Sequence, residues 1–236
     1  MASVSIPSSP TVKTQRPESI DQLITSIDRY NPDNLPLLED YLADQCRDAQ
    51  ACDLEANLAI LKLYQFNPSK VQPQVIANIL AKAVTQVPET DFSLCLYLLN
   101  PEMLAQEPIS QLVELHSLLD SCRYEAFWTM WRKDEMAQDA AGGVAGFESS
   151  VRRVIIESIS RSFQSISLVE LEAFLGLKGP KLLEWVKSLG WTQSDDGKSL
   201  QIPINKDNEA KSVLIKENLP LSKLTKIVAH AASPPS

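Results

Sequence analysis

The sequence predicts an all-α dominated protein with a small β wing, in which a HEAT-like antiparallel helical domain precedes a winged-helix domain. Three observations support this fold class. Apolar residues recur with helical spacing from residue 18 onwards. None of the seven glycines occurs before Gly142, and prolines separate the apolar segments of that glycine-free part. A glycine-turned pair of helices then precedes a segment with the turn signal of a β-hairpin.

Successive helices account for most of the first part of the chain. Asn34 is a favoured N-cap residue, and Pro68 ends another helix because it lacks an amide hydrogen and disfavours helix at Asn67. Thr90 or Asp91 caps a later one. Helices with such short connections generally run antiparallel to their neighbours. The periodicity predicts helices at 18–30, 34–49, 53–66, 72–86, 90–99, 108–121 and 122–138.

The composition changes at the alanine- and glycine-rich stretch 139–146, which we interpret as a flexible linker. Beyond it, helices are predicted at 147–163, 168–176 and 179–190, with an extended segment at 164–167 and a hairpin at 191–203. This order of elements is that of a winged helix. The predicted divisions are a disordered N-terminal tail (1–17), a HEAT-like helical domain (18–138), a linker (139–146), a winged-helix domain (147–203) and a C-terminal helix with a polar tail (204–236).

The composition is that of an ordinary soluble protein, with 44% hydrophobic and 22% charged residues. No apolar run approaches the roughly 18–20 residues of a membrane helix, and the N-terminus lacks the continuous apolar core of a secretory signal. We expect no cofactor, no metal, no small-molecule substrate and no membrane contact. A reduced cytosolic or nuclear compartment fits the thiols, which show no C-x-x-C spacing. They are Cys46, Cys52, Cys95 and Cys122.

Charge is distributed unevenly around a net value of −8. Acidic residues outnumber basic ones over 1–150, so this part would repel nucleic-acid phosphates, whereas the basic excess of 151–236 leaves nucleic-acid contact open. The outward face of the second helix of the helix-turn-helix lacks the Arg, Asn and Gln that read bases, and Glu184 lies there between lysines. We therefore favour protein docking and keep nucleic-acid binding as the alternative. The candidate contacts for RNA or an acidic partner are Arg152, Arg153, Arg161, Lys181 and Lys187.

The apolar run CDLEANLAILKLYQFNP contains two carboxylates, which raises the question of acid–base chemistry. On a helical wheel Asp53 and Glu55 point to nearly opposite sides, so they do not share a proton. Asp53 is better interpreted as an N-cap, and Asn57 and Tyr64 as half-buried groups that need hydrogen-bond partners. His116 lies among apolar residues without a nucleophile motif. The sequence therefore predicts no catalytic residue and no enzyme.

Several stretches are specific enough to indicate a family. They are IDRYNPDNLPLLEDYL (27–42), DLEANLAILKLYQFNP (53–68), TDFSLCLYLL (90–99), YEAFWTMW (124–131), GFESSVRRVI (146–155) and the Gly190–Trp191 pair. In these stretches the chain resembles the PCI-domain family of subunit K of eukaryotic translation initiation factor 3. The resemblance implies a PCI-type protein, in which a HEAT-like helical domain precedes a winged helix. Scaffold subunits of the proteasome lid and the signalosome share this pairing, and such a subunit is a further alternative.

The resemblance further implies a non-catalytic scaffold subunit that acts through protein–protein contacts in the cytoplasm, with some nuclear presence open. The factor as a whole binds the small ribosomal subunit and supports recruitment of initiator tRNA and mRNA. The close neighbour of subunit K is subunit L, and in the family winged helices pack side by side while C-terminal helices gather into a bundle. The residues expected at such an interface are Leu214, Ile215, Leu221, Leu224, Ile227 and Val228.

Overall fold

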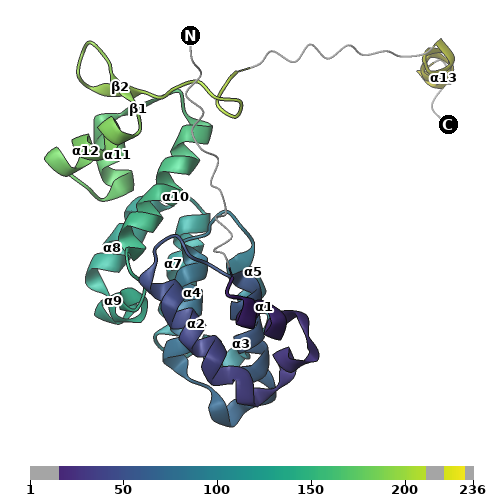
Figure 1. Ribbon diagram of the computed structural model, residues 1–236. Coiled ribbons are helices and arrows are strands. Elements are labelled where there is room, and N and C mark those ends of the chain that lie inside the picture. The colour runs from purple at the N-terminus through teal and green to yellow at the C-terminus, as the bar shows by residue number, and fades with distance from the viewer. Residues whose placement is uncertain (1–15, 211–220, 232–236) are drawn as a thin grey trace.

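The computed structural model describes residues 16–210 and 221–231. Residues 16–210 form a helical body with a small three-stranded sheet (Figure 1). The predicted fold class is confirmed. The helical part contains α1 (Glu18–Thr25), η1 (Ile27–Tyr30), η2 (Pro32–Asn34), α2 (Leu35–Arg47), α3 (Leu54–Phe66), η3 (Pro68–Lys70), α4 (Pro73–Val84), α5 (Asp91–Leu96), α6 (Pro101–Leu104), α7 (Ile109–Asp120), α8 (Tyr124–Lys133) and α9 (Glu135–Gly142). The remaining elements are α10 (Phe147–Ser162), β1 (Ser165–Ser167), α11 (Leu168–Leu175), α12 (Pro180–Ser188), β2 (Thr192–Gln193), β3 (Ser199–Gln201) and α13 (Leu221–Ala231).

Helices α3 and α4 form the centre of the helical part because each is apolar on more than one side. On α3, Ala56, Ile60 and Leu61 are all fully buried, although they point in different directions around the helix. On α4, every residue from Ile79 to Val84 is buried. Helices α2, α5, α7 and α9 contact α4. A helix that is apolar on several sides is stable inside such a stack, which explains the two apolar stripes in the sequence of α3.

Lys82 is the charged residue within the apolar surface of α4, and its side chain is fully buried. Its Nζ donates a hydrogen bond to the carbonyl oxygen of Asp48 at 2.8 Å, in the loop between α2 and α3. Burial takes the ammonium group out of water and lowers the pKa of Lys82 below its usual value of 10.5. The lysine thereby fixes the loop against α4, although its desolvation opposes folding.

The winged helix is built on a short antiparallel sheet with the strand order β1-β3-β2. Ile166 of β1 pairs with Leu200 of β3, and burial of both side chains sets the register of this strand pair. Ser167 ends β1 and begins α11 through a capping box, in which its hydroxyl accepts a hydrogen bond from the backbone nitrogen of Glu170. Gly176, in the left-handed conformation, ends α11 and begins the turn to α12.

Five residues, here named the α8–α11 joint, fasten the winged helix to the helical part. Trp128 on α8 donates from Nε1 to the carbonyl oxygen of Phe174 at 2.8 Å, and Arg152 on α10 donates from Nε to that of Leu175 at 3.1 Å. The Arg152 guanidinium also stacks over the Trp128 ring, 4.5 Å from its centroid. A Cβ atom on Gly176 would lie 2.8 Å from the indole. The joint therefore pairs the carbonyls that end α11 with donors from α8 and α10.

The stretch 139–146, expected to be a flexible linker, is instead part of the packed core. Helix α9 continues into this stretch, and Ala141 and Val144 are buried. Small alanine side chains allow α9 to pack closely against α4, α7 and α8. The backbone nitrogen of Ala145 then donates to the carbonyl oxygen of Cys46 at 2.7 Å. Alanine and glycine here indicate close packing between helices, a possibility that composition alone does not distinguish from a linker.

The predicted helix 122–138 is divided in two at Asp134. The backbone of this residue is extended, and its carboxylate accepts a hydrogen bond from the backbone nitrogen of Ala137 at 3.1 Å. Asp134 is thus the N-cap of α9, a role in which Asp competes well with a continuous helix. The short helix α6, which periodicity missed, has the same kind of start, with Asn100 as its N-cap and Pro101 in its first turn.

The joint predicts that Gly176→Ala destabilises the protein more than the same change at Gly190. Both glycines have a positive φ, of +61° and +68°, so alanine is strained at either position. Only at Gly176 would the new Cβ collide with Trp128, whereas nothing lies within 4 Å of it at Gly190. We expect the free energy of unfolding in urea to fall about 1–3 kcal/mol further for Gly176→Ala. Equal losses in the two variants would show that the indole does not constrain this turn.

Burial of Lys82 predicts a pH-dependent difference between the native chain and a Lys82→Met variant. Between the lowered pKa and 10.5 the folded state binds fewer protons than the unfolded state, so the contribution of Lys82 to stability rises with pH. The variant lacks this contribution, and its stability relative to the native chain therefore falls as the pH rises. Urea unfolding at several pH values measures this trend. The exposed Lys133→Met is the control, and a trend identical to that of the control would contradict the prediction.

Candidate protein-interaction site

The described part of the winged helix exposes four large apolar side chains, those of Phe163, Val169, Leu183 and Ile204. Val169 on α11 and Ile204 after β3 are 75% and 71% exposed. Transfer of a side chain of this size from water into an interface is worth about 1.5–3 kcal/mol. These positions are therefore candidates for contact with another protein.

The side chain of Asn208 joins the backbone segments that carry two of these apolar residues, Phe163 and Ile204. Its side chain is buried, and its Nδ2 donates to the carbonyl oxygens of Ser160, Phe163 and Pro203, each at 3.1 Å. The segment after β3 is thereby tied to the end of α10. As a result Phe163 and Ile204, which lie far apart in the sequence, are presented from one fixed corner of the domain.

The exposed basic residues of the winged helix are interleaved with acidic ones. Lys181 and Lys187 are exposed on α12, and Glu184 is exposed between them. Arg161, at the end of α10, lies with its Nε 4.0 Å from a carboxylate oxygen of Asp207. Neighbouring carboxylates weaken the attraction of such a surface for phosphate groups. The predicted contacts on α12 are thus accessible, but they do not form a continuous basic patch.

Arg152, a predicted contact for RNA or an acidic partner, bonds to groups within the protein and is therefore less accessible than the lysines of α12. Its side chain is only 13% exposed and, besides its role in the α8–α11 joint, pairs through Nη2 with Glu148 Oε2 at 2.8 Å. Partial burial disfavours the charged form of Glu148, but hydrogen bonds from Trp131 Nε1 and from Arg152 hold the pKa of this carboxyl below its usual value. Arg153, the next residue of α10, is half-buried.

The expected C-terminal interface lies partly within α13. Leu224 and Val228 are exposed, and because they are four residues apart they lie on the same face of the helix. Leu221 and Ile227 also belong to α13, whereas Leu214 and Ile215 lie outside the described residues. Among the side chains of α13 that the structure describes, Leu224 and Val228 are thus two exposed apolar residues of the predicted interface.

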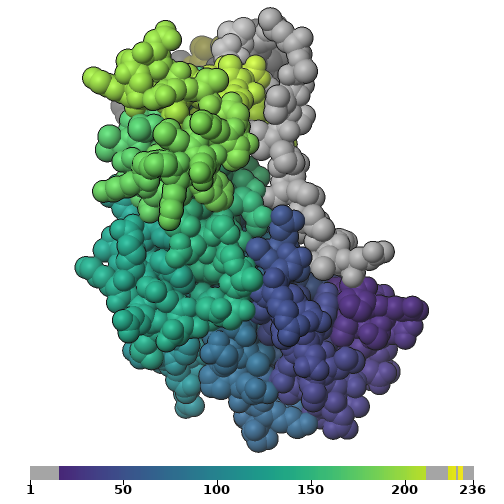
Figure 2. Space-filling view, turned by 60° about the vertical axis from the view of Figure 1, so that its left-hand side comes forward, coloured from purple at the N-terminus to yellow at the C-terminus, as the bar shows by residue number. Residues whose placement is uncertain are grey.

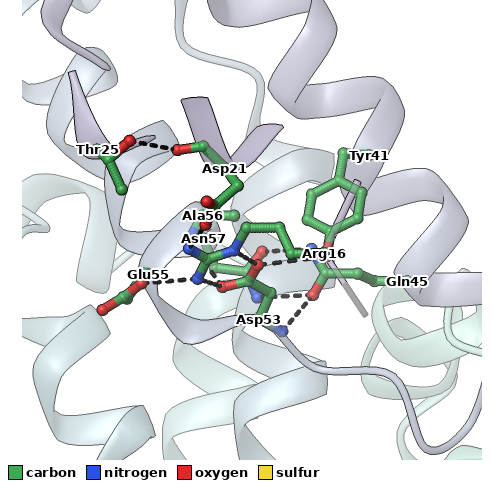
Figure 3. Close-up of polar contacts among 9 residues, drawn as sticks. All are labelled: Arg16, Asp21, Thr25, Tyr41, Gln45, Asp53, Glu55, Ala56 and Asn57. Atoms are coloured by element: carbon green, nitrogen blue, oxygen red, sulfur yellow. Dashed lines mark hydrogen bonds and ion pairs between the residues drawn. The ribbon is translucent and has the colours of Figure 1, made fainter. Parts of the chain in front are cut away.

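Arg16, which the sequence assigned to the disordered tail, is held by three carboxylates (Figure 3). Its Nε lies 2.6 Å from Asp53 Oδ2, and its Nη2 lies 2.8 Å from Asp53 Oδ1 and 2.7 Å from Glu55 Oε2. Its Nη1 lies 3.1 Å from Asp21 Oδ1. These hydrogen bonds, above all those with Asp53, raise the pKa of Arg16. Arg16, Asp21, Asp53 and Glu55, here named the Arg16 cluster, connect Arg16 to α1 and to the start of α3. The predicted tail 1–17 is therefore too long at its C-terminal end.

Asp53 has the N-cap role predicted for it, since its Oδ1 accepts a hydrogen bond from the backbone nitrogen of Ala56 at 3.2 Å. The helical wheel placed Asp53 and Glu55 on nearly opposite sides, but in the structure both carboxylates bind the guanidinium of Arg16. A helical wheel applies to helical residues only, whereas the backbone of Asp53 is extended. No spacing within the run indicated an arginine that lies 37 residues earlier in the chain.

The other polar groups of α3 have the partners that their burial requires. The Asn57 side chain exchanges hydrogen bonds with Gln45 of α2, at 3.2 and 3.4 Å. Gln45 Oε1 also accepts from the backbone nitrogen of Asp53 at 2.7 Å. Tyr64 Oη donates to Glu39 Oε1 at 2.6 Å. These bonds fix the register of α2 against α3, and the polar residues of the run are explained by packing.

His116 stacks on Phe92, with 3.9 Å between the ring centroids, and burial lowers its pKa below the usual value. Over residues 16–210 and 221–231, no three or more His, Cys, Asp or Glu side chains are grouped so that they could hold a metal ion. Within the same ranges, none of the helices combines the length and apolar character needed to cross a membrane.

Comparison with known proteins gives matches over most of the chain. The sequence profile of the CSN8/PSMD8/EIF3K family matches residues 70–213. The protein named eukaryotic translation initiation factor 3 subunit K from Sclerotinia sclerotiorum is 36% identical, over 94% of this chain and 96% of the relative. Proteins with the same name from Xenopus tropicalis and Yarrowia lipolytica are 38% and 35% identical. These two alignments cover 90% and 91% of this chain, and 95% and 94% of the relatives.

The Arg16 cluster predicts that Arg16→Ala lowers the free energy of unfolding by about 1–3 kcal/mol, because the buried Asp53 carboxylate loses charge-assisted hydrogen bonds. Arg47→Ala is the matched control. Arg47 pairs with Asp44, both side chains are exposed, and we expect a loss of roughly 0–1 kcal/mol. Urea unfolding measures both variants. Losses of the same size would mean that Arg16 contributes no more than a surface ion pair.

Proposed function

We infer that this chain, which belongs to the CSN8/PSMD8/EIF3K family and within it to the subunit K group of eukaryotic translation initiation factor 3, is a non-catalytic scaffold subunit of that factor. The observation that carries the scaffold role is the exposure of Val169, Leu183 and Ile204 on a winged helix held in place by the α8–α11 joint. A preformed apolar surface loses little conformational entropy on binding, which favours its use as a docking platform.

We further propose that the winged helix and α13 dock on subunit L of the same factor. The support comes from the family resemblance, in which neighbouring winged helices pack side by side and C-terminal helices form a bundle. The exposed pair Leu224 and Val228 on one face of α13 fits this arrangement. In this proposal the chain meets the small ribosomal subunit through the assembled factor, in the cytoplasm.

Two alternatives have weaker support. Direct RNA contact would rely on Lys181, Lys187 and Arg161, but Glu184 and Asp207 lie beside them. A place in a proteasome-lid or signalosome complex is compatible with the family profile, which groups CSN8, PSMD8 and EIF3K. However, the relatives that align over more than nine-tenths of the chain are named subunit K of initiation factor 3.

Affinity purification of the tagged full chain from cytosol, with mass spectrometry of the bound proteins, tests the class of complex. We expect other subunits of initiation factor 3, with subunit L among the most abundant. Recovery of proteasome-lid or signalosome subunits in their place would contradict the proposal. A steep loss of duplex-RNA binding by the full chain as salt rises would indicate direct RNA contact in addition.

The role of α13 is tested with the double variant Leu224→Asp and Val228→Asp, compared with the double variant Lys223→Asp and Lys226→Asp as the control. All four side chains are exposed, so folding of the remaining chain should not depend on them. We expect the apolar-to-Asp pair to reduce recovery of subunit L by about tenfold or more, as loss of interface anchors does. Deletion of residues 212–236 should act in the same direction. Unchanged recovery after this deletion would overturn the bundle proposal.

A further inference from the structure

A groove on the helical part has a volume of about 370 Å³. Helices α1 and α3, which line it, lie at the end of the molecule opposite α11 and α12, as the purple and green ends of the described chain show (Figure 1, Figure 2). The groove is lined by α1, η1, α3 and the segment that follows α5. On α3 the lining residues Glu55, Leu58, Ala59 and Lys62 follow the spacing of a single helix face. They span eight residues, which is seven steps of about 1.5 Å, so the groove extends about 10 Å along α3. This length matches two turns of a second helix.

The apolar part of the groove continues onto the surface around it. Leu58 is only half-buried, although the sequence of α3 places it in an apolar stripe. Tyr30 on η1 and Phe66 at the end of α3 are 52% and 59% exposed. Ile27, also on η1, is almost fully exposed. Aromatic side chains that stay exposed beside a hollow are typical anchors of protein interfaces.

The charge of the groove differs from that of the acidic helical part around it. Arg29 and Lys62 both line the groove, and each stacks over a neighbouring aromatic ring, at 5.2 Å from Tyr30 and 4.9 Å from Phe66. The lining carboxylate is that of Glu55, which lies 2.7 Å from Arg16 Nη2 (Figure 3). Arg16 also pairs with Asp21 and Asp53, so it offsets the charge of Glu55 only in part. The lining still carries two cations, Arg29 and Lys62, against one carboxylate, and this excess favours a negatively charged occupant.

We propose that this groove binds an amphipathic helix of a neighbouring protein chain whose apolar anchors are flanked by Asp or Glu. A helix laid along α3 presents anchors at i, i+3, i+4 and i+7, which fit a groove of this length. Its carboxylates meet Arg29 and Lys62, while its apolar side chains cover Leu58 and Tyr30. The inference rests on the proposed function in one respect, since the neighbouring chain is sought in the assembled initiation factor.

Hydroxyl-radical footprinting of the free chain and of the purified factor tests whether the groove is covered. We expect oxidation of Tyr30 and Phe66 to be at least about threefold slower in the factor, because a bound helix would exclude solvent from both rings. Met136, exposed on α9, reports general shielding. Equal rates for Tyr30 and Phe66 in the two samples would overturn the inference. Failure of the chain to co-purify with the factor would contradict the proposed function. Equal oxidation rates in a chain that does co-purify would contradict the groove inference alone.

A photo-crosslink identifies the occupant. With p-benzoylphenylalanine in place of Thr25, an exposed residue of the groove, we expect the crosslinked segment to be an acidic amphipathic sequence of another subunit. A crosslink to residues 1–15 of this chain, to a second copy or to RNA would contradict the proposal. The double variant Arg29→Glu and Lys62→Glu should lower the yield about tenfold. Lys133→Glu, a lysine outside the groove, is the control and should leave the yield unchanged.

Discussion

Trp128 and Arg152 donate hydrogen bonds to consecutive carbonyl groups, those of Phe174 and Leu175, at the point where α11 ends. Carbonyls at a helix end have no partner within the helix, and leaving them unpaired in a buried place would be costly. Trp128 belongs to the helical stack, whereas Arg152 belongs to α10 of the winged helix itself and stacks on the Trp128 ring. The bond from Trp128 and this stacking contact together give the winged helix one favoured position on the helical stack. The apolar side chains that it exposes are therefore presented in a fixed arrangement, which is what a scaffold requires of a docking surface.

The polar groups inside the helical stack act in a similar way. The side chain of Gln45 makes hydrogen bonds with the Asn57 side chain and with the backbone nitrogen of Asp53, and Lys82 donates one to the carbonyl oxygen of Asp48. Each of these contacts joins two segments that could otherwise slide past one another on their apolar faces. A buried polar group is tolerated only where its partner is in place, so such pairs select one register among several that hydrophobic burial alone would allow.

The distribution of charge separates the two surfaces that we assign to partners. The winged helix carries lysines mixed with carboxylates around exposed apolar residues, which favours a protein over a nucleic-acid backbone. The groove beside α3 lies in an acidic region, yet its lining carries two cations, Arg29 and Lys62, against the single carboxylate of Glu55, which is paired with Arg16. The chain is thus suited to contact two neighbours at opposite ends, consistent with a subunit embedded in a larger assembly.

The sequence by itself determined the fold class, the order of the longer helices and the hairpin, and the N-cap at Asp53, because periodicity, proline and capping residues act locally. Only the tertiary structure decided that 139–146 packs against the core and that Arg152 bonds to groups inside the protein. It also decided that Arg16 binds the carboxylates of Asp53 and Glu55 at the start of α3. The physical reason is the same in each case. Asp53 and Glu55 follow Arg16 by 37 and 39 residues, and Arg152 meets Leu175 of α11 and Trp128 of α8. Contacts between such distant segments depend on packing that no local pattern encodes.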